Sequence, residues 1–211
     1  MMNETELLNE MKALSYWAKQ AGQYNLAQCS SGNISHRLDD GTLLISQTRA
    51  WLSHLESNQV ARVNLTDGSI TNNIQPSGEL PLHLAVMRKR PDAKTVLHCQ
   101  SVSATTLACC ERKEIDYNVI IEVPIYIGEV RHIPYFMPGS TELANAVAEA
   151  SESADIIQLR NHGQVIIGID YNEVIQKAVF FELACTIILN NHFNYDCIKG
   201  EHLKILGGYR K

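Results

Sequence analysis

The stretch from Gln75 to Ser103 carries the side chains with the most chemical potential in this chain. Glu79 precedes a short apolar segment with helical spacing, and nineteen residues later His98 and Gln100 lie two positions apart in a segment typical of a buried strand. Side chains alternate along a strand, so we expect His98 and Gln100 to share one face and Cys99 to point to the other. His162 lies in a turn between two apolar runs. If the fold brings these four residues together, they form one polar cluster suited to a metal ion.

A solitary histidine is more often a structural or solvated residue than a metal ligand. His83 lies four residues after Glu79, so on a helix it would either support that carboxylate or pack in the core. His98 differs, because an imidazole at the end of a buried strand costs free energy unless it has a partner, which a metal would supply. The remaining histidines have no supporting pattern: His36, His54, His132, His192 and His202.

Three small polar segments have the composition of anion sites. Ser31-Gly32-Asn33 is permissive and rich in hydrogen-bond donors, and Thr48-Arg49 adds a hydroxyl and a cation. Ser77-Gly78 comes just before the expected helix at Leu80, where unpaired N–H groups favour anions. Each segment alone is equally consistent with an ordinary turn or cap. Three of them near one carboxylate and two histidines indicate a phosphate-binding site.

The elements that must position these residues interleave helices and strands. Apolar periodicity predicts helices over about 4–21, 80–89, 102–110, from Ser140 onward and 170–191. Strands are expected on both sides of the Asp39-Asp40-Gly41 turn and over 60–64, 95–100, 119–127, 130–135, 155–159 and 165–168. Because several strands are joined by tight turns, we predict a three-layer α/β fold with a mostly antiparallel mixed sheet flanked by helices.

Composition excludes several classes of protein. The chain has 211 residues, 45% hydrophobic and 19% charged, which suits one globular domain over 1–211. A net charge of −5 argues against a broad nucleic-acid surface, and no apolar run has the length of about 20 residues that a membrane span needs. The six cysteines form no Cys-x-x-Cys pair, and the polar N-terminus does not resemble a signal peptide. We therefore expect a cytoplasmic protein with reduced thiols.

Together the motifs resemble the class II sugar-phosphate aldolase and epimerase superfamily, which includes the adducin head domain. The resemblance covers about residues 5–191. It rests on the segments Ser31–Ser35, Leu44–Thr48, Pro76–Glu79, Arg90–His98 and Arg160–Gly163. Within the superfamily the chain is most similar to the L-fuculose-1-phosphate aldolases. That resemblance implies a C4 homotetramer with sites at subunit interfaces, a zinc ion, and retro-aldol cleavage of L-fuculose 1-phosphate to dihydroxyacetone phosphate and L-lactaldehyde.

The resemblance also assigns roles to residues. Glu79 falls on the motif glutamate, a metal ligand and general acid or base, while His98 and His162 fall on metal ligands. Tyr117 corresponds to a catalytic tyrosine contributed by a neighbouring subunit, and Tyr209 to one in a mobile C-terminal tail over 197–211. The phosphate-binding residues fall on Ser31, Gly32, Asn33, Thr48, Ser77 and Gly78.

Two positions depart from the family pattern. The family's metal motif is His-x-His, but this chain has Gln100 at the second position, and an amide oxygen is a weaker zinc donor than imidazole. Arg49 replaces a usual glycine after the phosphate-binding Thr48 and would crowd the site or add a positive charge. Three outcomes stay open for the metal: zinc held by the remaining ligands with Gln100 or water, a metal that prefers oxygen, or no metal. Two other functions also stay open: an L-ribulose-5-phosphate 4-epimerase-type enzyme, and a non-catalytic adducin-like domain.

Overall fold

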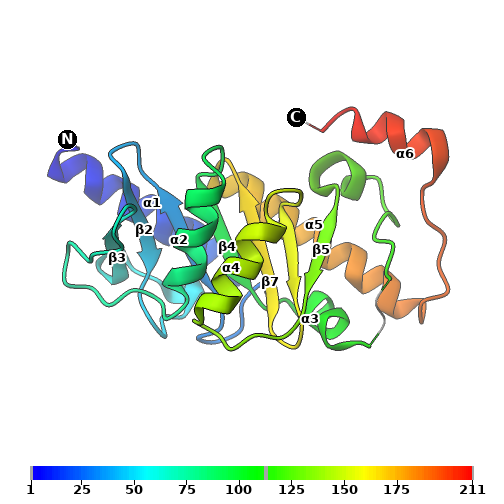
Figure 1. Ribbon diagram of the computed structural model, residues 1–211, viewed down its shortest axis with the longest axis horizontal. Helices are drawn as coiled ribbons and strands as arrows, with labels where there is room; N and C mark the ends of the chain where they lie inside the picture. Colours follow the sequence, from blue (N-terminus) through cyan, green and yellow to red (C-terminus); the bar gives the residue numbers. More distant parts are fainter. Residues whose placement is uncertain (1, 112–113, 211) are drawn as a thin grey trace.

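A seven-stranded mixed sheet forms the centre of the computed structural model, which describes residues 2–111 and 114–210 (Figure 1). The strand order is β3-β2-β1-β4-β7-β6-β5, and every neighbouring pair is antiparallel except β5 and β6. The strands are β1 (Asn33–Arg37), β2 (Thr42–Ser46), β3 (Val60–Asn64), β4 (Thr95–Cys99), β5 (Val130–Ile133), β6 (Ile156–Leu159) and β7 (Gly163–Gly168).

Helices cover both faces of the sheet and create two apolar cores (Figure 1). On one face lie α2 (Leu80–Lys89) and α4 (Thr141–Ala150), which pack against each other. On the other face lie α1 (Glu4–Gln23), α3 (Val102–Cys109) and α5 (Tyr171–Asn190). The predicted fold class, a mostly antiparallel mixed sheet flanked by helices, is thus confirmed.

The alternation along β4 connects the two cores. Val96 belongs to the core under α2 and α4, whereas Leu97 and Cys99 belong to the core on the other face. Because side chains alternate along a strand, His98 points to the α2 side. It is fully buried there, close to the end of the strand. The sequence-based assignment of His98 and Cys99 to opposite faces is therefore confirmed.

One predicted strand is wrong. Residues 119–127 are rich in β-branched side chains, but the chain turns at 119–121 and forms a π-helical segment, η3 (Val123–Ile127). Pro124 has no N–H to donate to a neighbouring strand, and Gly128 ends the segment with a φ of 74°. These two residues remove the segment from the sheet and leave β5 as a short edge strand.

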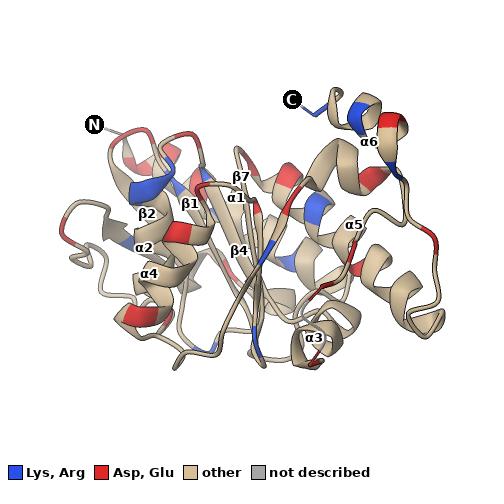
Figure 2. Cartoon of the chain, turned by 45° about the vertical axis from the view of Figure 1, so that its right-hand side comes forward, with Lys and Arg blue, Asp and Glu red and all other residues tan. Residues whose placement is uncertain are grey.

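The C-terminal segment contains a helix that the sequence pattern did not indicate, α6 (Gly200–Gly207), whereas Lys211 lies outside the described residues. Two 3₁₀ turns, η1 (Leu52–His54) and η2 (Ser57–Gln59), complete the fold. Acidic and basic residues are interspersed along the helices, and the strands are mostly uncharged (Figure 2). No helix in the described ranges is long and apolar enough to cross a membrane.

Candidate metal centre

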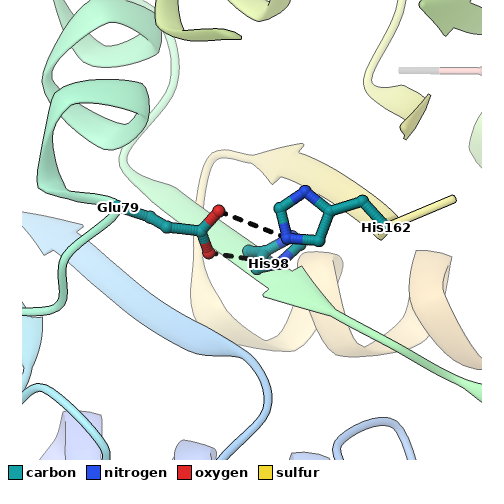
Figure 3. Close-up of side chains that lie close together, drawn as sticks. All are labelled: Glu79, His98 and His162. Carbon is teal, nitrogen blue, oxygen red and sulfur yellow. Dashed lines mark ion pairs between the residues drawn. The ribbon is translucent and has the colours of Figure 1, made fainter. Parts of the chain in front are cut away.

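Three elements bring Glu79, His98 and His162 together. Glu79 is the N-cap residue just before α2, His98 lies next to the last residue of β4, and His162 lies in the turn between β6 and β7. Antiparallel pairing places His98 opposite Val165, so the last residues of β4 lie beside the first residues of β7, at one end of these two strands. The three side chains point toward one another (Figure 3).

The distances within this cluster match a metal site. His98 Nε2 lies 3.2 Å from Glu79 Oε2, and His162 Nε2 lies 3.4 Å from Glu79 Oε1. One ligand atom from each residue lies within 4.8 Å of the other two. The side chain of His98 is fully buried, and those of Glu79 and His162 are 12% and 10% exposed. Two imidazoles and one carboxylate are a common ligand set for a catalytic zinc ion.

The protonation of His98 leaves a lone pair facing the carboxylate. His98 Nδ1 lies 2.9 Å from the backbone carbonyl oxygen of Gln164, which can only accept, so Nδ1 carries the proton. In the neutral ring Nε2 is then an acceptor, and it faces a carboxylate that is also an acceptor. Neither His98 Nε2 nor Glu79 Oε1 has a hydrogen-bond partner, although both atoms are buried. A cation between them would resolve this contact, so the residues fit a metal ion.

Electrostatics keep the cluster in its ligating state. Burial alone would raise the pKa of Glu79, but His98, the amide of Asn33 and His162 together lower it. Burial, and then the proximity of His98, lower the pKa of His162. At neutral pH Glu79 is therefore ionised and His162 neutral, which are the protonation states that metal ligation requires.

Gln100 lies next to the turn that carries His162. Its Cγ comes within 2.8 Å of the position that a Cβ on Gly163 would occupy, so Gln100 packs on the residue after His162. It also lines a cavity of about 600 Å³ together with Ser31 and Thr105. Position 163 must be glycine, since a Cβ there would also lie 2.4 Å from the carbonyl oxygen of Cys99.

The first predicted phosphate segment divides into two parts. Asn33 is buried, and its Nδ2 donates to Glu79 Oε2 at 2.9 Å, so at least part of its amide serves the cluster. Ser31 Oγ accepts from the backbone N–H of Gln28 and closes a turn. Gly32 has a φ of 84°, and a Cβ there would lie 2.8 Å from the carbonyl oxygen of His98. Glycine thus allows this turn to approach the end of β4.

The other two phosphate segments lie side by side. The backbone N–H of Thr48 donates to Gln75, and an isolated bridge joins Gln47 to Pro76. Ser77 is buried, and its Oγ accepts from the backbone N–H of Glu79. The loop that holds Thr48 therefore packs against the Ser77-Gly78 turn that leads into Glu79.

Neither predicted catalytic tyrosine lies at the cluster within one chain. Tyr117 is 5% exposed, stacks on His132 and lies against Phe181 with tilted rings, and burial is the main cause that raises its pKa. Tyr209 lines a cavity of about 1110 Å³ together with Arg90. Arg90 follows the C-terminal end of α2, whereas Glu79 precedes its N-terminal end, so the ten-residue helix separates them by about 15 Å. A role for Tyr209 at Glu79 would require another chain.

Sequence reasoning missed one partner of the cluster and left another open. The carbonyl oxygen of Gln164 belongs to the backbone, and no residue type signals it. His83 contacts Asn33, and its only signal was the spacing of four residues from Glu79.

Comparisons with known proteins agree with this geometry. Residues 12–189 match the family described as Class II Aldolase and Adducin N-terminal domain. A 3-oxo-tetronate 4-phosphate decarboxylase from Escherichia coli K12 is 33% identical over 179 residues, 83% of this chain and 80% of the relative. An L-fuculose phosphate aldolase from Methanocaldococcus jannaschii is 31% identical over 162 residues, 77% of this chain and 86% of the relative.

A solved structure supports the same relationship. The crystal structure of YgbL from Escherichia coli superimposes with a TM-score of 0.89 at 25% identity, covering 95% of this chain and 99% of that one. A structure of L-fuculose 1-phosphate aldolase gives a TM-score of 0.85 at 20% identity, over 98% and 97% of the two chains, which is a likeness of fold. The chain therefore belongs to the family of class II aldolases and adducin N-terminal domains.

Proposed function

We propose that this protein is a metal-dependent lyase that breaks a C–C bond next to the ketone of a short phosphorylated sugar or sugar acid. The observation that carries the proposal is the buried cluster in which Glu79 Oε1 and His98 Nε2 have no hydrogen-bond partner. A bound divalent ion would act as a Lewis acid toward the negative charge that develops on the ketone oxygen during cleavage. Two histidines and a carboxylate favour zinc among such ions.

The leading substrate is 3-oxo-tetronate 4-phosphate, because relatives with this decarboxylase activity are up to 33% identical over 83% of this chain. Loss of the carboxylate from this β-keto acid leaves its bonding electron pair on C2, where the adjacent ketone delocalises it as an enediolate. Protonation at C2 then gives dihydroxyacetone phosphate and carbon dioxide. The ionised carboxylate holds no proton of its own, so Glu79 Oε1 would take a proton from water and pass it to C2.

The second candidate is retro-aldol cleavage of L-fuculose 1-phosphate, since relatives of that activity are 31% and 32% identical over 77% of this chain. Loss of the C4 hydroxyl proton and cleavage of the C3–C4 bond give L-lactaldehyde and the enediolate of the same three-carbon phosphate, which then takes up one proton at C3. The two candidates therefore share the enediolate, and they differ in the leaving fragment and in the base that the C4 hydroxyl requires. A 4-epimerase would use the same bond cleavage and rejoin the fragments.

We propose that the phosphate binds among Ser31-Gly32, Thr48 and Ser77-Gly78. The bridge between Gln47 and Pro76 holds two of these segments together at the start of α2, where helix geometry favours an anion. Arg49 is exposed and has a φ of 58° in the same loop, so it would add a positive charge there. We also propose a homotetramer, in which a neighbouring chain could supply the tyrosine that the cluster lacks; light scattering of the purified protein tests this.

The experiment that tests the function measures metal and product in parallel. Metal content of the purified protein is determined before and after zinc addition, and each substrate is then assayed for dihydroxyacetone phosphate, with carbon dioxide and L-lactaldehyde measured separately. We expect about one zinc per chain, carbon dioxide from 3-oxo-tetronate 4-phosphate, and loss of turnover on chelation.

The outcomes separate the alternatives. Release of aldehyde from L-fuculose 1-phosphate, without decarboxylation, would assign the second candidate. An isomerised pentose phosphate from L-ribulose 5-phosphate, without free aldehyde, would assign an epimerase. Failure to bind metal under either condition would overturn the proposal and favour a non-catalytic, adducin-like domain.

A further inference from the structure

A fully buried imidazole lies behind the metal cluster and has no part in the function proposed above. His83 is on the inner side of α2 with a relative exposure of 0%. Its Nδ1 lies 2.7 Å from Ser35 Oγ on β1, and its Nε2 contacts Asn33 Oδ1 on the same strand. Asn33 in turn reaches Glu79. These contacts form a hydrogen-bond chain, Ser35–His83–Asn33–Glu79, that runs from the sheet to the carboxylate.

The Glu79 carboxylate fixes the direction of every hydrogen bond in this hydrogen-bond chain. The ionised carboxylate of Glu79 can only accept, so Asn33 must present its NH₂ group to Oε2. Asn33 then presents its carbonyl oxygen to His83, which must donate from Nε2. The unprotonated Nδ1 accepts from the hydroxyl of Ser35. These two hydrogen bonds together require the neutral ring with its proton on Nε2.

This polarity has a consequence for the orientation of Asn33. A free amide side chain can turn over and exchange its oxygen and nitrogen, which would aim the carbonyl oxygen at the carboxylate. The N–H of His83 prevents that exchange, because the turned amide would place its NH₂ group against another donor. Glu79 Oε2 is then held on the Asn33 side, and the second oxygen, Oε1, stays without a partner in the cluster.

We propose that His83 is a positioning residue that locks the amide of Asn33 and so orients the Glu79 carboxylate for metal binding. The inference rests on the proposed function in that it takes a divalent metal as the ligand of Glu79. It also changes the expected role of Asn33 from a phosphate contact to a support of the carboxylate. Groups of this kind behind metal ligands set affinity as well as geometry.

The first test measures zinc affinity of metal-free protein by competition with a chelating indicator, a readout that does not depend on turnover. His83→Phe keeps an aromatic ring but loses the donor, and we expect its zinc affinity to fall at least about tenfold. His83→Gln places an amide N–H where Nε2 was, and we expect affinity to recover to within about threefold of wild type. A purely structural role would not predict this rescue.

A matched control separates positioning from general loss of a buried hydrogen bond. Thr95 is fully buried on β4, the strand of His98, and its hydroxyl lies 2.8 Å from His36 Nδ1, outside the cluster. Thr95→Val should lower thermal stability and leave zinc affinity unchanged. If folded His83→Phe binds zinc as tightly as wild type, or if Thr95→Val weakens binding as much, the positioning role is overturned.

A second measurement needs no variant and no metal. Nitrogen-15 NMR of labelled wild-type protein reports which ring nitrogen of each histidine carries the proton, and we expect the Nε2–H form at His83. An Nδ1–H form or a charged ring would overturn the proposal even if His83→Phe does not fold. Wild-type protein that binds no zinc but shows the Nε2–H form would refute the proposed function and the metal-positioning role, while the hydrogen-bond chain itself would stand.

Discussion

Two buried carboxylates, Glu79 and Asp155, lie beyond opposite ends of α2 and meet their basic neighbours in different ways. Both carboxylate oxygens of Asp155 are paired within the chain: Oδ1 lies 3.1 Å from Arg90, and Oδ2 lies 2.9 Å from Lys177 and 3.0 Å from Arg210. Glu79 has histidines at similar distances, but its Oε1 and the Nε2 of His98 are left without hydrogen-bond partners. The Asp155 cluster is closed, whereas the Glu79 cluster has room for a ligand.

The difference shows why burial and a shifted pKa do not by themselves identify a site. Burial would raise the pKa of both carboxylates, and in both the basic neighbours outweigh it and lower the pKa. What distinguishes Glu79 is the type of neighbour. Lys177 and Arg90 are permanent donors that satisfy Asp155, whereas a neutral histidine with its other nitrogen occupied offers only a lone pair. Unsatisfied acceptors, not charge, distinguish the candidate metal cluster from the Asp155 cluster.

The largest effect is expected from Glu79→Gln. This variant removes the group that moves the proton, so turnover should fall at least about a thousandfold, or about 4 kcal/mol of transition-state stabilisation. Because it also removes a buried charge, we expect the free energy of unfolding to change by less than about 1 kcal/mol. Steady-state kinetics and urea unfolding measure the two quantities. Turnover close to wild type would break the distinction between the two clusters.

Asp155→Asn should show the opposite pattern. It leaves Lys177, whose side chain is 4% exposed, with only the more exposed Glu173 as a counter-charge, so the free energy of unfolding should fall by about 3 kcal/mol. Zinc affinity should not change.

Acid titration provides the control for Asp155→Asn. The pKa of Asp155 is lowered in the folded protein, so its stabilisation is present above the ordinary value of 3.8 and is lost as pH falls through the folded pKa. The stability difference between wild type and variant should therefore shrink in that range. A difference that persists in strong acid would show that the loss does not come from the ion pairs.

Gln100→His tests whether position 100 can contribute a ligand to the Glu79 cluster. Gln100 packs beside Gly163, so a histidine there would add an imidazole next to His162. We expect zinc binding to tighten about tenfold, or about 1.4 kcal/mol, in the chelator competition assay. Gln100→Leu is the control and should leave affinity nearly unchanged. If Gln100→His does not bind zinc more tightly than wild type, position 100 does not reach the metal.

The smallest effect is expected from Arg210→Ala. Arg210 contacts Asp155, but its side chain is 35% exposed, and Arg90 and Lys177 remain as partners of the carboxylate. We expect the free energy of unfolding to fall by about 0.5 kcal/mol, as for an exposed ion pair, with no change in zinc affinity. A loss of several kcal/mol in urea unfolding would show that the closed cluster depends on the C-terminal segment.

Much of the fold could be predicted from the sequence, because local signals and burial agree there. The alternation through His98 and Cys99 gave the correct faces of β4. The helix expected from Ser140 onward is α4, and Ser140 Oγ accepts from the backbone N–H of Leu143. Residues 119–127 misled because β-branched residues favour a strand, while the chain direction there is set by Pro124 and Gly128.

The site was predictable only as a set of residue types. The family resemblance implied that Glu79, His98 and His162 converge, but periodicity could not give the strand order on which this convergence depends. The positions of Tyr117 and Tyr209 depend on the packing of distant segments, and the hydrogen-bond chain through His83 depends on how α2 packs on β1. Local propensity does not predict contacts between segments that are distant in the sequence.

The pairing of β1 with β4 places Asn33 directly opposite His98, although the two are far apart in the chain. Contacts between distant segments form slowly in folding, because closing a long loop costs entropy before the contacts are gained. The metal centre needs this pairing, the β4–β7 pairing and the docking of α2 at once. We therefore expect zinc-binding competence to be among the last properties recovered on refolding, after helical circular dichroism has returned.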